Sequence, residues 1–591
     1  MGRSCNAVLL AIIASAITAH GDSATKRGAG ACAFVHANVV PMDRERVLAD
    51  QTVVVENGRI TQVGPSSGTL VPRGACKIEA KGKYLIPGLV DAHVHLQSPN
   101  ELPLYLANGV TTVFNLDGRP AHLLWRKKIN ADEMVGPTIF TTGPMFEKAR
   151  TAEEDVRLVD EQAAAGYDGI KIYNQVSKEE FPALIAEAKK KNMLLMGHVA
   201  RGPEFETTLQ SGQSIAHLEE FTYTFFNPKH DDHNSHIVYD ESRIPEAVRL
   251  TKESGISVTA TLSTYAEIVQ QATDLDTFLK NPDMKYLPPW TQAKYQPAAN
   301  RYKNGFSPDA YPQIQTSLAF QRTLLKALSE AGVPLMCGTD APSVGPVPGF
   351  GIHDELQEFV NDGLTPYQSL QTATVNPARY LRHSDDFGTV EVGKRGDLVL
   401  LEGNPLVSII STRRVAGVMA RGEWMPQAEL ARMVEDVPAS YQRELRIIKK
   451  QMQSDPAGAA KYLAETDPYL DAGQTALTDL ATAEGFDHAR VLVKKLREAD
   501  PKSNLVTEDG INHVGYDLLG QKRYKEAIAM FEMNTQDFPK SANTYDSLAE
   551  AFFNSGDLPH ALENYRKALD VDPKYGNAAE AEKFIREKGQ K

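Results

Sequence analysis

The sequence of 591 residues predicts an α/β protein built around a (β/α)8 TIM barrel. Three observations lead to this prediction. Between residues 88 and 383, short apolar runs alternate with helical stretches, which is typical of βαβ units with a parallel sheet. Eight such runs are present, the number that closes a barrel of this kind. Polar residues with metal-binding side chains stand at the ends of several runs.

The N-terminus is typical of a secretory signal. Arg3 supplies a positive charge, and the stretch from Ala7 to Ala19 is apolar but too short to span a bilayer. We therefore expect residues 1–24 to be a signal peptide and the mature protein to be periplasmic or secreted, with a buried N-terminal helix as the alternative. No later segment is long and apolar enough to predict a membrane span.

The charge and the cysteines restrict the partners and the redox state. A formal net charge of −13 argues against a nucleic-acid partner, because phosphate binding needs a basic surface. Beyond the signal, Cys32 and Cys76 lie near the start of the chain and Cys337 lies far away. In an oxidising compartment Cys32 and Cys76 could form a disulfide, or they could remain free thiols; both alternatives stay open.

Two separated segments predict one small composite β-sandwich domain, formed by residues 25–87 and 384–425. In the first, two strands meet at Asn57-Gly58, a strong hairpin signal. The strands of the second segment have no partners of their own, so we expect them to pair with the first. These late strands are expected at Phe387–Val392, Asp397–Glu402 and Val415–Arg421.

The barrel is predicted over residues 88–383, and its strands are the eight apolar runs. A helix is expected after them, from Leu364 to Leu381. The connection before the last run is unusually long and rich in aromatic residues, as in a lid or a pocket wall; alternatively, its aromatic residues only pack its own helices. The eight runs are Leu89–His95, Val110–Leu116, Thr138–Thr142, Gly169–Tyr173, Leu194–His198, Ser214–Leu218, Ile256–Ala260 and Val333–Thr339.

The C-terminal part is predicted to be helical, with a linker over residues 426–472 and an all-α domain over 473–591. Ala527 and Ala561 are 561 − 527 = 34 residues apart, and an aromatic position and a proline recur at the same interval. This period resembles that of the tetratricopeptide repeat (TPR), a stack of helix pairs. Such a stack either binds a protein or peptide partner or packs on the barrel or on a second copy; the sequence leaves both possibilities open.

Six side chains at predicted strand ends could bind metal. His93 and His95 are two residues apart on the first run, so both point to the same face. The other four stand on later runs, at the face where barrel enzymes place their active sites. Each alone has an ordinary structural explanation, but six in register predict a metal centre. The four others are Lys171, His198, His217 and Asp340.

Residues 33–425 resemble the amidohydrolase superfamily of metal-dependent hydrolases. Within it, the chain is most similar to the imidazolonepropionase-like and prolidase-like branch, which includes exported dipeptidases and carboxypeptidases. The motifs that carry the resemblance are Ile86–His95, Gly338–Ala341, Gly363–Pro366 together with Ala373–Ala378, and Gly393–Val399.

The resemblance implies two divalent metal ions, most simply Zn2+. His93, His95 and Asp340 would hold the first ion, and His198 and His217 the second. Lys171 would bridge them as a CO2-derived carbamate, since a plain amine, with a pKa of about 10.4, is protonated and donates instead of coordinating. This lysine separates the chain from mononuclear relatives such as the cytosine deaminases.

The implied reaction is hydrolysis of an amide or peptide C–N bond, in dipeptides or N-acyl amino acids. A hydroxide between the metals would attack the carbonyl, with Asp340 as general base. The alternatives are a lactonase or phosphotriesterase with the same centre, or a TPR scaffold with a non-catalytic barrel.

No arginine is identified as a carboxylate clamp. Candidate substrate contacts are Tyr173, Tyr223 and His353, while His230, His233 and His236 are read as a polar loop, with extra ligands as the alternative.

Overall fold

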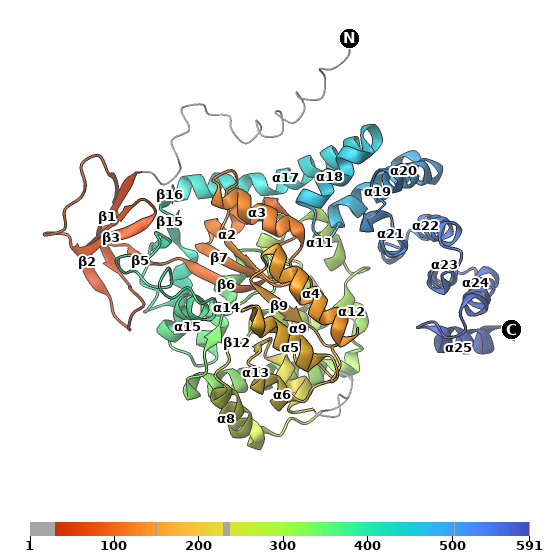
Figure 1. The fold of residues 1–591 in the computed structure, drawn as a ribbon, viewed down its shortest axis with the longest axis horizontal. Coiled ribbons are helices and arrows are strands. Elements are labelled where there is room, and N and C mark those ends of the chain that lie inside the picture. The colour runs from red at the N-terminus through yellow and green to blue at the C-terminus, as the bar shows by residue number, and fades with distance from the viewer. Residues whose placement is uncertain (1–29, 148–149, 228–236, 502, 590–591) are drawn as a thin grey trace, which may run out of the picture.

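The computed structural model describes residues 30–147, 150–227, 237–501 and 503–589 (Figure 1). The expected signal peptide, residues 1–24, lies outside the described residues, and so do the three loop histidines between 230 and 236. Within the described ranges, no helix combines the length and hydropathy that a bilayer crossing requires.

The N-terminal and late strands form one eight-stranded sheet, in the order β16-β15-β14-β5-β1-β2-β3, with β4 beside β1. The predicted hairpin is present, because Asn57 and Gly58 both adopt the positive φ that a tight turn requires. The two segments join where β14 pairs antiparallel with β5. The strands are β1 Ala31–Val39, β2 Leu48–Glu56, β3 Arg59–Pro65, β4 Cys76–Glu79, β5 Tyr84–Pro87, β14 Leu398–Leu401, β15 Val415–Ala420 and β16 Glu423–Pro426.

The predicted strand Phe387–Val392 is wrong. This segment consists of turns and coil. Gly388 has a φ of +100°, which interrupts an extended run. Its amides make isolated hydrogen bonds instead of a strand ladder, such as the one from the Val390 amide to the Pro41 carbonyl at 2.9 Å.

Cys32 and Cys76 lie directly opposite each other on β1 and β4. Both are free thiols, and burial is the main reason that the pKa of Cys32 is raised to about 12. A disulfide between them therefore needs oxidation and no change of strand register.

The eight apolar runs all form strands, arranged as two parallel sheets. The first sheet has the order β6-β7-β8 and the second β13-β12-β11-β10-β9. Hydrogen bonds link them at both edges: the Gly143 amide donates to the Gly169 carbonyl at 3.1 Å, and the Ala92 amide donates to the Cys337 carbonyl at 2.9 Å. The strands are β6 Leu89–Val94, β7 Val110–Asn115, β8 Thr138–Thr141, β9 Gly169–Ile172, β10 Leu194–Gly197, β11 Ser214–Ala216, β12 Val258–Thr259 and β13 Leu335–Met336.

Helices follow these strands and cover the sheets (Figure 1). The long connection between β12 and β13 contains α9 Leu262–Thr273, α10 Leu275–Phe278, α11 Pro289–Tyr295, α12 Arg301–Gly305 and α13 Tyr311–Ala331. The other helices of this part are α2 Leu102–Ala107, α3 Pro120–Asn130, α4 Ala152–Ala165, α5 Phe181–Lys190, α6 Phe205–Gln210, α7 Glu219–Thr224, α8 Ile244–Ser254, α14 Gly351–Asn361, α15 Pro366–Thr372 and α16 Val375–Tyr380.

The single helix expected from Leu364 to Leu381 is instead two helices, α15 and α16. The chain breaks at Thr374, with φ −136° and ψ −80°. Pro377 explains the break, because a proline in a helix interior clashes with the carbonyl four residues before it.

The C-terminal part is helical. Its repeated spacing is visible in the helices, because α21 and α23 begin 542 − 508 = 34 residues apart and α22 and α24 begin 558 − 524 = 34 apart. Its identification as TPR stays a prediction. The helices are α17 Gln427–Ser454, α18 Pro456–Thr466, α19 Asp471–Glu484, α20 Phe486–Ala499, α21 Glu508–Gly520, α22 Tyr524–Asp537, α23 Ala542–Asn554, α24 Leu558–Val571 and α25 Ala578–Lys588.

The first of these helices dock against the part that contains the parallel sheets. The Trp125 indole donates to the Glu465 carbonyl at 2.7 Å, and the Tyr469 hydroxyl donates to the Asp117 carbonyl at 2.8 Å. Buried apolar residues of α17, among them Tyr441, share one core with Leu104 of α2. Asp117 follows β7, so this docking reaches the end of the strands where the metal-binding side chains lie.

Candidate metal centre

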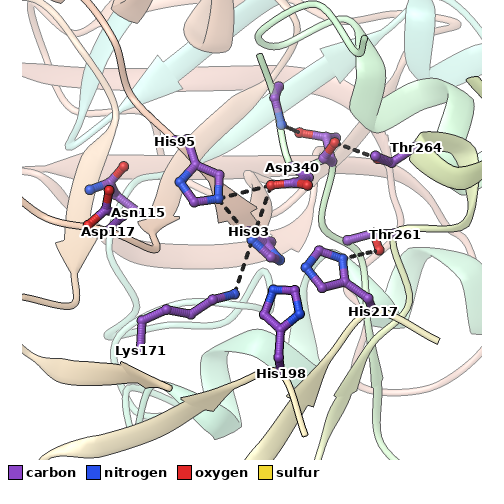
Figure 2. Close-up of polar contacts among 12 residues, drawn as sticks. His93, His95, Asn115, Asp117, Lys171, His198, His217, Thr261, Thr264 and Asp340 are labelled. Atoms are coloured by element: carbon purple, nitrogen blue, oxygen red, sulfur yellow. Dashed lines mark hydrogen bonds and ion pairs between the residues drawn. The ribbon is translucent and has the colours of Figure 1, made fainter. Parts of the chain in front are cut away.

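The six predicted ligands converge at the carboxyl ends of the parallel strands (Figure 2). His93 is central, because its Nε2 lies 3.3 Å from Nε2 of His95, 3.3 Å from Oδ1 of Asp340 and 3.5 Å from Nζ of Lys171. His95 Nε2 and Asp340 Oδ1 are 2.9 Å apart. His217 and His198 continue the group on the other side (Figure 2). The ring centroid of His217 lies 4.7 Å from that of His93 and 4.7 Å from that of His198.

Unusual backbone geometry directs two of these side chains. His217 and Asp340 have φ values of 80° and 53°, which a residue with a side chain adopts only when its surroundings hold it there. Gly338 allows the close approach, because a Cβ at this position would lie 2.7 Å from the Cβ of His93. Tight packing of the last strand against the first therefore brings Asp340 beside the histidines.

Asp91 ties the first strand to the last. Its Oδ1 accepts the Thr339 amide at 3.0 Å, and its Oδ2 accepts the Thr339 hydroxyl at 2.7 Å. Burial raises the pKa of the Asp91 carboxyl to about 7. This contact holds the two chain segments in register. His93 lies two residues after Asp91, and Asp340 lies one residue after Thr339.

Two acceptors orient the remaining histidines. His198 Nδ1 donates to Oε1 of Glu220 at 2.7 Å, and His217 Nδ1 donates to Oγ1 of Thr261 at 2.7 Å. The Thr261 hydroxyl itself donates to the Ala260 carbonyl at 2.8 Å, so its oxygen can only accept from His217. In both histidines the proton is thereby fixed on Nδ1, and Nε2 keeps its lone pair for a metal.

The cluster is buried, and its electrostatics disfavour positive charge. Lys171 is 1% exposed, and burial lowers the pKa of its amine to about 8. Burial also lowers the pKa of His93 and His217 well below the usual value. Burial opposes ionisation of Asp340, but the hydrogen bond with His95 and the nearby charges outweigh it and lower the pKa of Asp340 to about 2. Neutral imidazoles beside a carboxylate are metal ligands in their binding form.

The donor set fits divalent transition-metal ions. Ligand atoms of His93, His217 and Asp340 all lie within 4.8 Å of one another. Imidazole nitrogens and a carboxylate oxygen suit zinc and similar ions. Lone pairs of neutral imidazoles facing one another in a buried site gain stability when a cation lies between them. The structure thus brings together all six predicted residues, while their division between two ions stays a prediction.

A cavity of about 1050 Å3 opens over the cluster, and residues far apart in the sequence line it. The strand ends contribute His95, Lys171 and Asp340, and the long β12–β13 connection contributes Arg301 and Tyr302. The C-terminal helical part forms another wall, with Tyr469, Asp471, Gln474, Asp509 and His513. The helical part therefore limits the space available to a substrate.

The three candidate substrate contacts lie in different places. Tyr173 lines the cavity, and its ring centroid is 4.3 Å from that of His198. Tyr223 is outside the described cavity lining. Its ring lies under the Arg201 guanidinium, and its ring centroid is 5.4 Å from Cζ of Arg201. His353 is also outside that lining, and its Nδ1 is hydrogen-bonded with the Thr412 hydroxyl at 3.0 Å. Of the three, only Tyr173 lies in the described cavity lining, and its role as a substrate contact stays a prediction.

Sequence reasoning missed several residues of the site. Glu220 follows His217 by three positions, a spacing that could have suggested a supporting carboxylate. Thr261 and Asp91 carry no signal of their own, because their role depends on neighbouring strands. Arg301 stands in a long connection whose course the sequence does not predict.

Comparisons with known proteins give distant relatives of this chain. The chain is 29% identical over 144 residues to an adenine deaminase of Paracoccus denitrificans, covering 22% of this chain and only 24% of that protein. It is 23% identical to a 5-methylthioadenosine/S-adenosylhomocysteine deaminase of Caldanaerobacter subterraneus subsp. tengcongensis over 406 residues, 62% of this chain and 84% of that protein.

Solved structures share the fold. A bottromycin amidohydrolase matches with a TM-score of 0.57 and 22% identity, covering 70% of this chain and 90% of that one. A Xaa-Pro dipeptidase with bound methionine in its active site matches with a TM-score of 0.53 and 21% identity, covering 67% and 100%. The model of the amidohydrolase family matches residues 84–425, more than half of the chain. The chain therefore belongs to the amidohydrolase family.

Proposed function

We propose that the protein is an exported, binuclear metal-dependent amidohydrolase that cleaves a C–N bond, in dipeptides or N-acyl amino acids. One observation carries the proposal. Lys171 Nζ lies 3.5 Å from Nε2 of His93, inside the same buried cluster as Asp340. As a carbamate, a lysine at this position would offer oxygen ligands to two metal ions.

The residues of the chain have separate roles in this proposal. Two bound divalent ions, which we propose to be Zn2+, would supply charge stabilisation and lower the pKa of water. His93 and His95 would hold the first ion together with Asp340, and His198 and His217 the second. Asp340 accepts the proton of the attacking water and delivers it to the leaving nitrogen, for which its place in the cavity lining is suited. Tyr173, beside His198, is placed to donate to the substrate carbonyl.

The fold around the site is proposed to be a (β/α)8 barrel. The hydrogen bonds at both edges of the two parallel sheets support closure into a ring. The 34-residue spacing of the C-terminal helices supports the TPR identification. Export rests on the sequence of residues 1–24 alone.

A deaminase is the second candidate function, because relatives of this chain are named adenine deaminase and 5-methylthioadenosine/S-adenosylhomocysteine deaminase. Deamination also breaks a C–N bond with water.

The test is a substrate screen on purified protein reconstituted with Zn2+. Xaa-Pro dipeptides and N-acyl amino acids should be hydrolysed, with loss of activity on chelation and recovery on adding zinc. Ammonia release from adenine or 5-methylthioadenosine would favour the deaminase. Turnover of lactones or phosphotriesters only would favour the other hydrolases, and absence of metal and of all turnover would favour a scaffold.

A further inference from the structure

One positive side chain in the cavity has no acidic partner within the described part of the chain. Four cationic residues line it: Arg119, Lys171, Lys294 and Arg301. Arg119 pairs with Asp117 at 2.9 Å, Lys294 pairs with Asp471 at 2.8 Å, and Lys171 belongs to the metal cluster. Among the residues that the structure describes, Arg301 takes part in no ion pair. Its side chain is nevertheless accessible in the cavity.

The backbone at Arg301 is held in place. Asn300, which is 1% exposed, accepts the amides of Tyr302 at 3.1 Å and of Lys303 at 2.8 Å. The side-chain amide of Asn300 donates to Oε1 of Gln271 on α9 at 2.9 Å. These contacts fix the start of α12 against a longer buried helix, so that Arg301 is presented to the cavity from a rigid base.

The guanidinium group is oriented but not neutralised. Its Cζ lies 4.6 Å from the ring centroid of Tyr302, and Nη2 donates to the Tyr302 hydroxyl. Burial is the main reason that the pKa of Tyr302 is raised to about 12, so this hydroxyl is neutral. An arginine has five N–H donors in a planar fork. Most of the fork is therefore free for a planar anion, and a carboxylate matches it in two parallel hydrogen bonds.

Arg301 is also within electrostatic reach of the metal cluster. Burial opposes its charge, but Tyr302 and then Asp340 outweigh this effect and raise the pKa of the guanidinium. Its charge acts on Tyr173 as well. Arg301 and Asp340 line the same cavity, so one substrate that reaches both has to carry a negative group in addition to its reacting carbonyl.

We propose that Arg301 binds the free α-carboxylate of the substrate, which lies on the leaving-group side of the cleaved bond. This inference rests on the proposed hydrolase function and narrows its substrates to dipeptides and N-acyl amino acids with an unblocked carboxyl end. Carboxamides of the same compounds lack the charge that Arg301 recognises.

The experiment compares N-acetyl-L-methionine with N-acetyl-L-methioninamide in zinc-loaded wild type and in Arg301→Met. A charge-assisted pair of hydrogen bonds predicts that kcat/KM for the free acid falls about 10- to 100-fold in Arg301→Met. The amide should be a poor substrate, hydrolysed equally by both proteins. Arg301→Lys should lie between them for the acid.

Lys303→Met is the matched control. Lys303 is the exposed cation two residues along the same helix, outside the described cavity lining, with Nζ 5.9 Å from the ring centroid of Tyr311. It should keep the wild-type preference for the acid. Equal loss for acid and amide in Arg301→Met, or a wild-type enzyme that hydrolyses both equally, would overturn the proposal.

Calorimetric binding of the same two compounds separates this inference from the proposed function. If neither compound is hydrolysed, the function fails, but wild type should still bind the acid about 10- to 100-fold more tightly than Arg301→Met does. If hydrolysis occurs and acid binding does not change in Arg301→Met, only the role of Arg301 fails.

Discussion

Replacement of Glu220 by glutamine tests whether the orientation of a histidine matters for metal binding. Glu220 is 1% exposed, and its Oε1 accepts from His198 Nδ1 at 2.7 Å. Its Oε2 accepts the Val199 amide at 3.1 Å and Nη1 of Arg201 at 3.3 Å. Burial opposes ionisation of Glu220, yet the electrostatic interaction and the hydrogen bond with the His198 imidazole, together with Arg201, outweigh burial and lower the pKa of the carboxyl.

Glutamine keeps the shape of Glu220 but has one acceptor oxygen. If this oxygen faces Val199, the amide NH2 faces Nδ1 of His198, which must then give up its proton and carry it on Nε2. If the oxygen faces His198, the NH2 opposes two donors. Loss of a partner behind a metal-binding histidine weakens metal affinity about 10- to 100-fold. At 1.36 kcal/mol for each factor of ten, this is about 1.4–2.7 kcal/mol.

The assay is competition for Zn2+ with a chromogenic chelator, together with kcat/KM at rising zinc concentration. Glu220→Gln should need about 10- to 100-fold more free zinc for half occupancy of one site, with activity recovering at high zinc. Glu187→Gln is the control, since Glu187 is a mostly buried glutamate that pairs with Lys190 at 3.0 Å on α5. Wild-type zinc affinity in Glu220→Gln would refute the reasoning.

Three further predictions concern the bridging lysine, pH and docking. Lys171→Ala should lose metal and activity, with partial rescue by formate or acetate; unchanged metal content would exclude two bridged ions. Burial raises the pKa of Glu444 to about 7 and of Glu101 to about 8, from 4.5. The folded state therefore holds their protons more tightly, and the free energy of unfolding should fall as pH rises from about 4.5 to 8. Thermal unfolding across this range should show a shallower fall for Glu444→Gln, and an unchanged slope would contradict the assignment. Trp125→Ala removes a side chain that is 1% exposed and its hydrogen bond to Glu465, and should cost about 3–5 kcal/mol in chemical denaturation; a loss below 1 kcal/mol would show that this contact does not secure the helical part.

Local patterns predicted the parallel strands well, because an apolar run bounded by turns or charges indicates a buried strand without knowledge of its partners. His93 and His95 are the clearest case, since their spacing alone places both side chains on one face. The strand expected at Phe387–Val392 shows the limit of such local patterns. Its residues suggest a strand, but Gly388 turns the chain before the segment can pair with a neighbour.

The missed features depend on contacts between distant segments. Arg301 enters the cavity only because Asn300 is anchored to α9, and the wall formed by Tyr469 depends on how α17–α19 dock. Neither contact leaves a periodic pattern in the sequence. The 34-residue spacing predicted helix pairs, but not that α19 and the first of the paired helices, α21, would border the cavity.

The central claim is that a carboxylated Lys171 joins two metal ions. Anomalous X-ray diffraction at the zinc edge, on crystals of the zinc-loaded protein, tests it most directly. We predict two anomalous peaks about 3.5–4 Å apart, one beside His93, His95 and Asp340 and the other beside His198 and His217, with density for a carboxylated Lys171 between them. A single peak, or an unmodified Lys171 pointing away from the metal, would contradict the account.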